Sequence, residues 1–301
     1  MRRRQYDNEK AQENMKHAAP KKRSQLGMVW HQLLKNKLAV CGLIIFVAII
    51  LASLFVSIFV DYDKIILHDL MNKNQTPSLQ HWFGTDSYGR DLLLRILYGA
   101  RISLFIGVTS VLGGMLLGGA VGAISGFYGG KIDIVVMRFM DILMAIPSTL
   151  FAICVVSALG QGVMNLMLAI MVSLIPQFAM IVRSSVLTIK NSEYIEAARC
   201  GGTSTARIIL RHIIPNAMGP IIVQATLALG GVILTAASMS FIGLGVQPPD
   251  PEWGAILTEG QEFMRDYPHL VLFPGITIML AVLACNFMGD GLRDALDPKL
   301  K

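Results

Sequence analysis

The sequence predicts an all-α, polytopic membrane protein with six transmembrane helices. Of its 301 residues, 53% are hydrophobic and only 15% are charged, whereas charged residues make up about a quarter of an ordinary soluble domain. A helix needs about 20 apolar residues to cross the hydrocarbon of a bilayer. Six such runs cover residues 38–60, 102–124, 134–159, 163–187, 217–243 and 270–288.

Residues 1–37 are predicted to form a basic tail before the first membrane helix. The tail is rich in Lys, Arg, Gln, Asn and Glu, and it has too few apolar residues to build a core, so we expect a mobile segment. The first apolar run, 38–60, contains no charged residue, Pro or Asn. A long basic segment precedes this run and no small-residue cleavage site follows it. This pattern favours a retained membrane anchor over a removed signal peptide.

The distribution of Lys and Arg predicts which ends of the helices face the cytoplasm. Most of the 26 basic residues lie in the tail, near the 125–133 turn, in the 188–216 loop and at the C-terminus. Because basic residues stay on the cytoplasmic side, we predict that both termini are cytoplasmic. The net charge of +6 follows from this topology, with the tail touching anionic lipid of the bilayer. No basic surface interleaved with aromatic residues occurs, so nucleic acid is not an expected partner.

Residues 61–101 connect the first two apolar runs, and we expect this loop outside the membrane. Gly84, Asp86 and Gly89 are typical turn residues, and the leucine-rich stretch 92–97 predicts a short helix lying on the outer membrane surface. The favoured interpretation is an interfacial helix that seals the bundle. The alternative is a docking surface for an external delivery protein, with Asp86 and Arg90 as candidate residues.

Glycines recur every fourth residue in the second apolar run, at Gly114, Gly118, Gly122 and Gly126. This spacing places them on one helix face. A ridge of glycines lets a neighbouring membrane helix approach closely. We therefore assign these residues to helix packing, and the same smooth ridge would suit a helix that slides against its neighbour.

Two prolines interrupt the third and fourth runs, and three charges, Asp133, Arg138 and Asp141, lie at the start of the third run. Pro147 and Pro176 remove backbone hydrogen bonds, so we expect each to interrupt and bend its helix. Such helices either leave room for a central cavity or are merely kinked. Arg138 and Asp141 lie three residues apart on one helix face and are expected to pair with each other. Both lie near the cytoplasmic end, which favours an ion pair at the membrane interface over a substrate ligand.

Residues 240–264, SFIGLGVQPPDPEWGAILTEGQEFM, form a second predicted external segment. Three prolines fix three φ angles and remove most of the freedom of this loop, and acidic residues are expected to make its outer surface negative. These residues are Pro248, Pro249 and Pro251, with Asp250, Glu252, Glu259, Glu262 and Asp266. The candidates for external contacts in this loop are Pro248, Pro249, Glu252 and Trp253.

The chain carries no sequence signature of an energy source or a catalytic centre. The nearest match to a phosphate loop, SGFYGGKID, lacks the leading Gly at the needed spacing and has Ile132 where Ser or Thr would bind Mg²⁺. The apolar runs hold no Ser/His, paired-Asp or His-rich constellation and no filter-like loop. Cysteines and histidines lack disulfide and metal-ligand spacing. A membrane-embedded enzyme and an ion channel are therefore remote alternatives to a transport subunit.

The polar stretch SEYIEAARCGGTSTARIILRHIIPN (192–216) lies between two apolar runs on the predicted cytoplasmic side. One interpretation is an ordinary amphipathic connection. However, Glu196-Ala197-Ala198, followed after three residues by Gly202 and later by Pro215, resembles the EAA signature of the membrane subunits of ABC importers. The resemblance makes this loop the place where the ATP-driven motion of another protein enters the chain.

Four further segments resemble the dipeptide, oligopeptide and nickel branch of that family, in its second-type permease subunit. They are HWFGTDSYGRDLLLRILYGARISL (81–104), GFYGGKIDIVVMRFMDILMAIPS (126–148), GLGVQPPDPEWGAIL (243–257) and NFMGDGLRDALDPKLK (286–301). The resemblance covers nearly the whole chain after residue 38, in matching order. One departure is that His212 and Ile214 stand where the general signature has Ile and Leu, although RHI-x-PN is common in the peptide branch.

The resemblance implies the type I ABC importer permease fold. Residues 102–290 would form the permease domain, with a coupling loop at 193–216, after an added helix at 38–60 and the external loop 61–101. Residues 291–301 would form a cytoplasmic cap. In the family the coupling loop folds as two short helices with the Gly at their junction and sits in a cleft of the ATPase. Glu196 would then pair with a basic ATPase residue, Ala197 and Ala198 would allow close approach, and Gly202 would allow the bend.

The resemblance also implies the partners and the location. A similar but distinct second permease subunit, two ATPase subunits and an external solute-binding protein would complete a transporter in the bacterial plasma membrane. This chain would bind no cofactor, with ATP and Mg held by the ATPase subunits. Short peptides delivered by the binding protein are the expected solute, and glutathione or nickel complexes are the alternatives.

Overall fold

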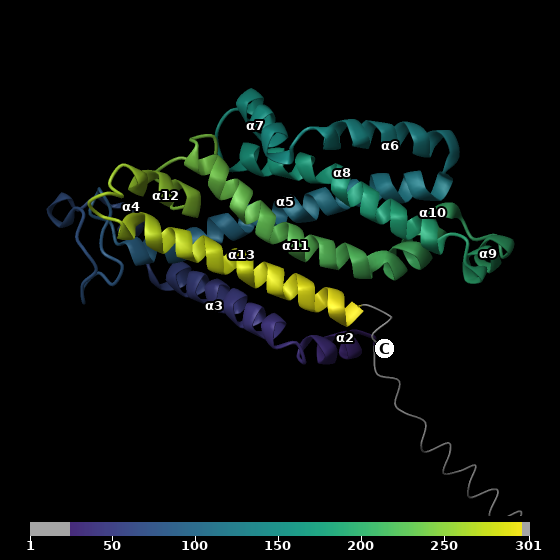
Figure 1. The fold of residues 1–301 in the computed structure, drawn as a ribbon, viewed down its shortest axis with the longest axis horizontal. Helices are drawn as coiled ribbons and strands as arrows, with labels where there is room; N and C mark the ends of the chain where they lie inside the picture. Colours follow the sequence, from purple (N-terminus) through teal and green to yellow (C-terminus); the bar gives the residue numbers. More distant parts are fainter. Residues whose placement is uncertain (1–24, 297–301) are drawn as a thin grey trace, which may run out of the picture.

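The computed structural model describes residues 25–296, and within them the chain is an elongated bundle of helices without a β-strand (Figure 1). The predicted mobile tail up to residue 24 and the last five residues of the predicted cap lie outside this range. Five long helices run along the bundle axis. They are α3 (Lys37–Phe59), α5 (Leu92–Tyr128), α8 (Val163–Ile189), α11 (Ile214–Phe241) and α13 (His269–Leu296).

The predicted third span is two helices and not one. α6 (Gly130–Ala145) and α7 (Ser148–Leu159) meet at an angle of 89°. Ile146 takes an extended conformation before Pro147, because a residue that precedes proline is disfavoured in the helical region. The described residues therefore contain five helices apolar and long enough to cross a membrane, or six if the bent pair is one span. The second predicted interruption is wrong, since α8 continues through Pro176 to Ile189.

A second correction concerns the start of the second membrane helix. The short surface helix predicted at 92–97 is the first part of α5, which continues without a break into the apolar run. Asp91 caps this helix by accepting a 2.9 Å hydrogen bond from the backbone N–H of Leu94. No proline follows within α5, so nothing in the sequence ends the helix at the membrane surface.

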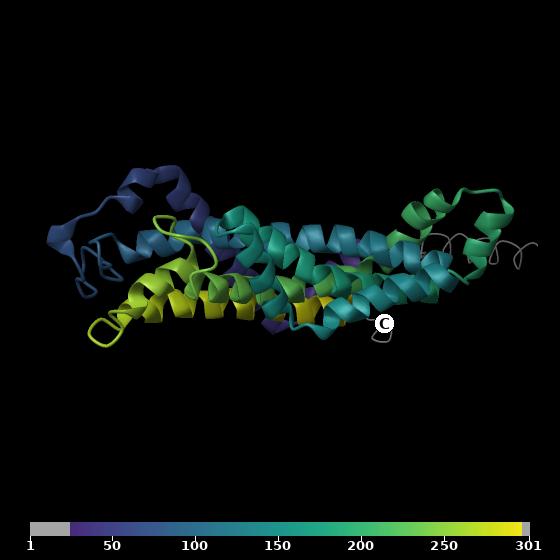
Figure 2. The same cartoon turned by 90° about the horizontal axis from the view of Figure 1, so that it is seen from above.

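Shorter elements lie at the two ends of the bundle (Figures 1 and 2). One end holds α9 (Glu193–Cys200), followed by α10 (Thr205–Ile208) and the π-helical turn η2 (Ile209–Ile213), which continues into α11. α2 (Gln25–Leu33) packs near this end against α13. The opposite end holds α4 (Tyr62–Ile66), η1 (Leu70–Asn72) and α12 (Trp253–Gln261). The segments predicted to be cytoplasmic and those predicted to be external thus gather at opposite ends.

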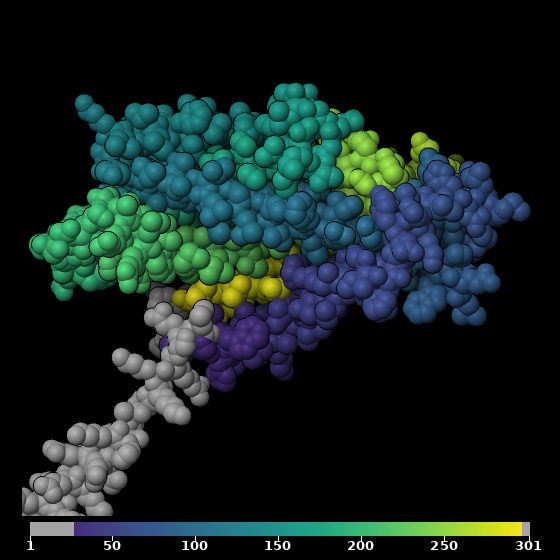
Figure 3. Space-filling view, turned by 180° about the vertical axis from the view of Figure 1, so that it is seen from behind, coloured from purple at the N-terminus to yellow at the C-terminus, as the bar shows by residue number. Residues whose placement is uncertain are grey.

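The glycine ridge of α5 faces α8. A Cβ atom on Gly118 would lie 2.4 Å from the backbone oxygen of Ile175, and one on Gly122 would lie 2.2 Å from that of Ala179. Gly114 and Gly126 meet Leu174 and Val186 in the same row. Small residues let the two backbones approach to this distance. α5 and α8 form the centre of the bundle, with α6 and α7 along one long edge and α3 along the opposite edge (Figure 3).

Candidate functional site

The loop that follows α8 projects from one end of the bundle and is built around α9. Two backbone hydrogen bonds end this helix, from Thr203 N–H to the Ala198 oxygen (3.1 Å) and from Gly202 N–H to the Arg199 oxygen (2.9 Å). This pattern is a Schellman motif, which needs a residue with positive φ. Gly202 supplies it with a φ of +73°. A Cβ atom on Gly202 would meet no other atom within 4 Å, so the backbone conformation alone selects glycine here.

α9 is anchored by one buried side chain and exposes its other faces. Ile195 is fully buried in an apolar cluster with Val186, Ile208 and Ile213. In contrast, Glu193, Tyr194, Glu196 and Ala197 are exposed, and Ala198 is half-buried. No ion pair among the residues that the structure describes includes Glu193 or Glu196. The two carboxylates are therefore free to meet a basic partner.

The π-helical turn η2 explains how the loop rejoins the bundle. Ile208 and Ile213 are both buried in the cluster beneath α9 although they lie five residues apart. In a regular α-helix this spacing would point them in directions far apart, because one turn takes about 3.6 residues. The wider turn of a π-helix brings them to one side. The sequence gives no clear signal for this turn, and we did not predict it.

Polar contacts connect the base of the loop to α5, α6 and α8. The Lys190 ammonium donates a 2.9 Å hydrogen bond to the backbone oxygen of Gly126, and the Arg199 guanidinium lies 5.1 Å from the centre of the Phe127 ring. Deeper in the bundle, Arg183 of α8 donates a 2.6 Å hydrogen bond to Asp133 of α6. We did not predict this pair, whose signal in the sequence is Arg183 inside one apolar run and Asp133 just before another.

The opposite end is closed by four buried charges. Arg90 donates 2.7 Å hydrogen bonds to Asp86 and Glu259. Arg95 donates to the same two carboxylates. Each side chain is at least nine-tenths buried. Asp86 and Arg90, predicted as candidates for external docking, therefore lie inside the fold, where they connect the 61–91 loop to α12.

Two further external candidates are also buried. Glu252 caps α12 by accepting a 3.0 Å hydrogen bond from Ala255 N–H, and it accepts another from Ser103 of α5. The Trp253 indole donates a 2.9 Å hydrogen bond to the backbone oxygen of Ile96. The negative outer surface that we predicted is correspondingly smaller, since Glu252 and Glu259 do not reach it. Glu262 and Asp266 are exposed.

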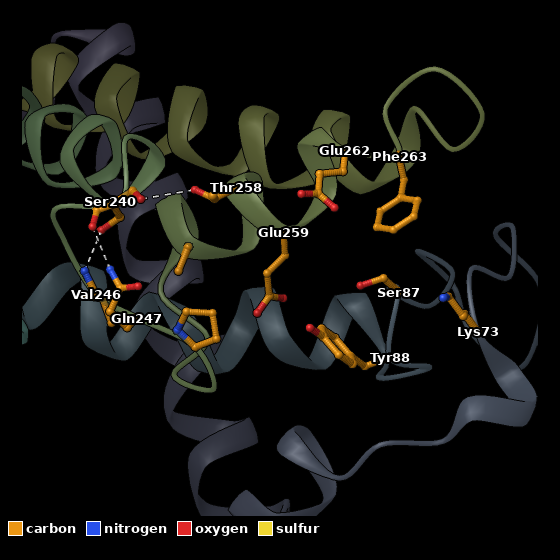
Figure 4. Close-up of a pocket in the computed structure, with 13 residues that line it drawn as sticks. Lys73, Ser87, Tyr88, Ser240, Val246, Gln247, Thr258, Glu259, Glu262 and Phe263 are labelled. Carbon is orange, nitrogen blue, oxygen red and sulfur yellow. Dashed lines mark hydrogen bonds between the residues drawn. The ribbon is translucent and has the colours of Figure 1, made fainter.

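The exposed candidates border a cleft of about 350 Å³ at this end (Figure 4). Its walls come from the 61–91 loop, the segment after α11, and α12. Pro248 lines the cleft with Lys73, Tyr88, Glu262 and Phe263, and Pro249 is exposed beside it. The Lys73 ammonium lies 5.9 Å from the centre of the Phe263 ring. The α12 end thus has a small polar and aromatic cleft next to the buried ion pairs.

Comparisons with known proteins agree with this architecture. Residues 118–301 match the family of binding-protein-dependent transport system inner membrane components, and residues 24–77 match the N-terminal TM domain of oligopeptide transport permease C. The dipeptide transport system permease protein DppC of Alkalihalophilus pseudofirmus is 47% identical over 90% of this chain and 88% of its own length. The glutathione transport system permease protein GsiD of Pectobacterium atrosepticum is 44% identical over 90% of both chains.

A solved structure has a similar fold. A chain of the MetNI methionine ABC transporter, solved in inward facing conformations, superposes with a TM-score of 0.56 over 68% of this chain and 96% of its own. Its sequence identity of 20% limits the likeness to the fold.

Proposed function

Because this chain belongs to the family of binding-protein-dependent transport system inner membrane components, we propose that it is one membrane half of an ATP-driven importer of short peptides. It is a non-catalytic permease subunit, and a second permease chain, two ATPase subunits and an external binding protein complete the transporter. ATP and Mg are bound by the ATPases. The distinct but similar second permease makes the membrane part a heterodimer.

The observation that carries this proposal is the exposed, partnerless face of α9. Glu193 and Glu196 point away from the one buried anchor, Ile195, and Ala197 leaves room for a close neighbour. A basic surface of an ATPase would suit this face by charge. α9 is then the coupling helix, and the 193–216 loop is the element that the ATPase moves.

The contacts beneath α9 supply a route for that movement. Ile195 packs on Ile208, Ile213 and Val186, so a displacement of α9 acts on α8 and on the start of α11 together. Lys190 and the Arg183–Asp133 pair extend the connection to α5 and α6. Closure of the ATPases would then rock the helices around a solute path, because an alternating-access transporter needs an external force on its bundle.

The proposed function implies an orientation in the bacterial plasma membrane. The α9 end faces the cytoplasm together with both termini, and the end that holds α12 faces the binding protein. The permease domain corresponds to the predicted 102–290 core, with its first helix extended outward to Leu92. The cleft beside Pro248, Pro249 and Glu262 is then part of the external contact surface.

Short peptides are the solute that the relatives favour. The two reported relatives are named for dipeptide and glutathione transport, and glutathione is itself a small peptide. Glutathione is therefore the second candidate, and nickel complexes are a third from the wider branch. Uptake assays with di- to pentapeptides, glutathione and Ni²⁺ would separate these solutes.

The coupling role is tested by changing α9 while leaving its buried anchor in place. In the double variant Glu196→Trp and Gly202→Val, we expect solute uptake to be lost while the ATPases either hydrolyse ATP without transport or no longer copurify. The matched control is Asp63→Trp, an exposed acidic residue of α4 at the opposite end, which should keep both ATPase copurification and coupling. Full uptake by the double variant would defeat the proposal.

A further inference from the structure

An apolar groove of about 410 Å³ lies between α5 and the segment that links α9 to α11. On the face shown in Figure 3, this segment lies beside α5. Every residue that lines the groove is apolar or glycine. Leu116 on one wall and Leu210 on the other are 67% and 68% exposed. In a membrane protein, apolar side chains this exposed contact either lipid or another protein.

The α5 wall of the groove spans most of one leaflet of a bilayer. Leu116, Ala120 and Ile124 line the groove, and their four-residue spacing places them in one row along the helix. From Leu116 to Ile124 the row is about 12 Å long at 1.5 Å per residue. The hydrocarbon of a bilayer is about 30 Å thick, so one leaflet contributes about 15 Å. An acyl chain that lies along this row therefore fits the depth of its leaflet.

The row ends in a tyrosine at the α9 end of the molecule. Tyr128 comes four residues after Ile124, is the last residue of α5 and is 59% exposed. Tyrosine is enriched at the membrane–water interface, where its ring lies at the level of the lipid headgroups. Tyr128 thus marks the headgroup level at this end of the groove.

Two arginines lie on the other wall at the same end. Arg207 and Arg211 directly follow the groove residues Ala206 and Leu210, and both arginines are exposed. No ion pair among residues 25–296 includes either of them. A guanidinium group matches the geometry of a phosphate, and the stem of an arginine packs along apolar surface while its charge stays in water. The charge at the mouth of the groove is therefore complementary to an anionic headgroup.

A second cleft in the same half of the molecule provides the contrast. It lies between α8 and α11, and its walls include the polar side chains of Ser184, Ser185, Thr188 and Asn216. An acyl chain against these groups would remove them from water without offering a hydrogen bond, which is costly. Of the two clefts, the one beside α5 is suited to an acyl chain.

We infer that the groove beside α5 binds one anionic phospholipid of the leaflet at the α9 end. An acyl chain lies between α5 and η2, and Arg207 and Arg211 hold the headgroup phosphate. Because α10 and η2 connect α9 to α11, the bound lipid holds the base of the 193–216 loop at the membrane surface. The site depends on the membrane location of the chain, and neither the imported solute nor the coupling role of α9 enters it.

A photo-reactive phosphatidylglycerol with a diazirine in its acyl chain would locate the site. The protein is kept in its complete complex in phosphatidylcholine vesicles that contain this probe, and labelled peptides are identified by mass spectrometry. We expect labels in residues 115–124 and 206–221. Unlabelled phosphatidylglycerol should compete with the probe there, and added phosphatidylcholine should not. Labels spread evenly over the exposed apolar segments, α3 included, or equal competition by both lipids, would overturn the inference.

The role of the charges is tested with the double variant Arg207→Gln and Arg211→Gln. We expect its affinity for the probe to be about thirtyfold lower, because each arginine near the surface strengthens the attraction to anionic lipid. The matched control is Lys35→Gln with Lys37→Gln, which removes two exposed charges that follow α2 at the same end. The control should bind the probe as the unchanged protein does. Equal losses of affinity in both double variants would contradict a specific headgroup site.

The role of the groove is tested without changing a charge. Ala120→Trp fills the groove and should abolish labelling of residues 206–221. Leu117→Trp is the control, because Leu117 is an exposed residue of α5 that does not line the groove. Unchanged affinity for the probe in both Ala120→Trp and the double arginine variant would overturn the inference, whichever of these variants is the more stable.

Occupation of the groove by protein is tested with benzoylphenylalanine in place of Leu116. We expect this position to form a cross-link to phospholipid. A cross-link to another protein chain, with no lipid product, would overturn the inference. Solute uptake driven by ATP is measured in the same preparation. Uptake that persists without lipid binding would leave the proposed function intact, so the two failures are distinguishable.

Discussion

The two ends of this bundle use charge in opposite ways. At the α12 end, Asp86, Arg90, Arg95 and Glu259 are buried and form ion pairs that join three segments. At the α9 end, Glu193 and Glu196 are exposed and unpaired among the described residues, and one isoleucine anchors the helix. A buried network holds segments in one arrangement, because removing any member leaves an uncompensated charge. The difference indicates that the α12 end is held in one arrangement, and we propose that the α9 end is the one that moves.

The largest effect is expected from the buried network. Arg95→Leu leaves Asp86 and Glu259 with one cation, and breaking a buried pair in this way costs about 3–5 kcal/mol. We expect the variant to accumulate poorly and to unfold at a clearly lower temperature in detergent. Arg265→Leu, an exposed arginine at the same end, is the control. Equal melting temperatures for the two variants would contradict the idea that the buried ion pairs hold the α12 end in one arrangement.

The second-largest effect on stability is expected at the contact between α5 and α8, the helices that connect the two ends. A Cβ atom on Gly122 would overlap the backbone of Ala179, whereas one on Gly119 would meet only Val182, at 3.8 Å. Overpacking a tight contact costs about 1–3 kcal/mol, so Gly122→Ala should lower the melting temperature. Gly119→Ala should be neutral or slightly stabilising, since Ala favours a helix by about 1 kcal/mol over Gly. Similar behaviour of both variants would rule out the close approach.

The smallest effect on stability is expected at the end of α9, where function should change more than folding. Gly202→Ala forces a Cβ atom into a left-handed conformation, at a cost of about 1–2 kcal/mol. Gly201→Ala is the neighbouring control, because Gly201 has a φ of −75°. We expect Gly202→Ala to raise the ATP hydrolysed per solute imported, with a smaller fall in melting temperature than Gly122→Ala causes. An unchanged ratio in both variants would show that the shape of this turn does not matter.

Most of the fold follows from patterns within short stretches of sequence. Apolar runs predict the membrane helices, and glycines at every fourth residue predict the face of α5 that α8 covers. The pre-proline residue Ile146 marks where α6 ends, but the angle of 89° depends on how α7 packs against α8. The surface helix predicted at 92–97 was wrong because no local signal separates it from the apolar run that follows.

The candidate site shows the same contrast between features that depend on nearby residues and features that depend on distant ones. The sequence motif already indicates the turn at Gly202, which has a positive φ, because this turn depends only on neighbouring residues. The roles of Arg95 and Glu259 cannot be predicted in this way, because they lie 164 residues apart and only the folded chain brings them together. The burial of Trp253 likewise depends on a hydrogen bond to Ile96 of α5, far away in sequence.

The comparison between the two ends is tested most directly by site-specific photo-cross-linking in intact cells. Benzoylphenylalanine would replace Ala197 on the exposed face of α9 and, in a second variant, the exposed Glu262 at the α12 end. The account predicts that position 197 cross-links to an ATPase subunit and that position 262 never does. Cross-linking of position 197 to lipid or to an external protein, with no ATPase product, would contradict a coupling role for α9.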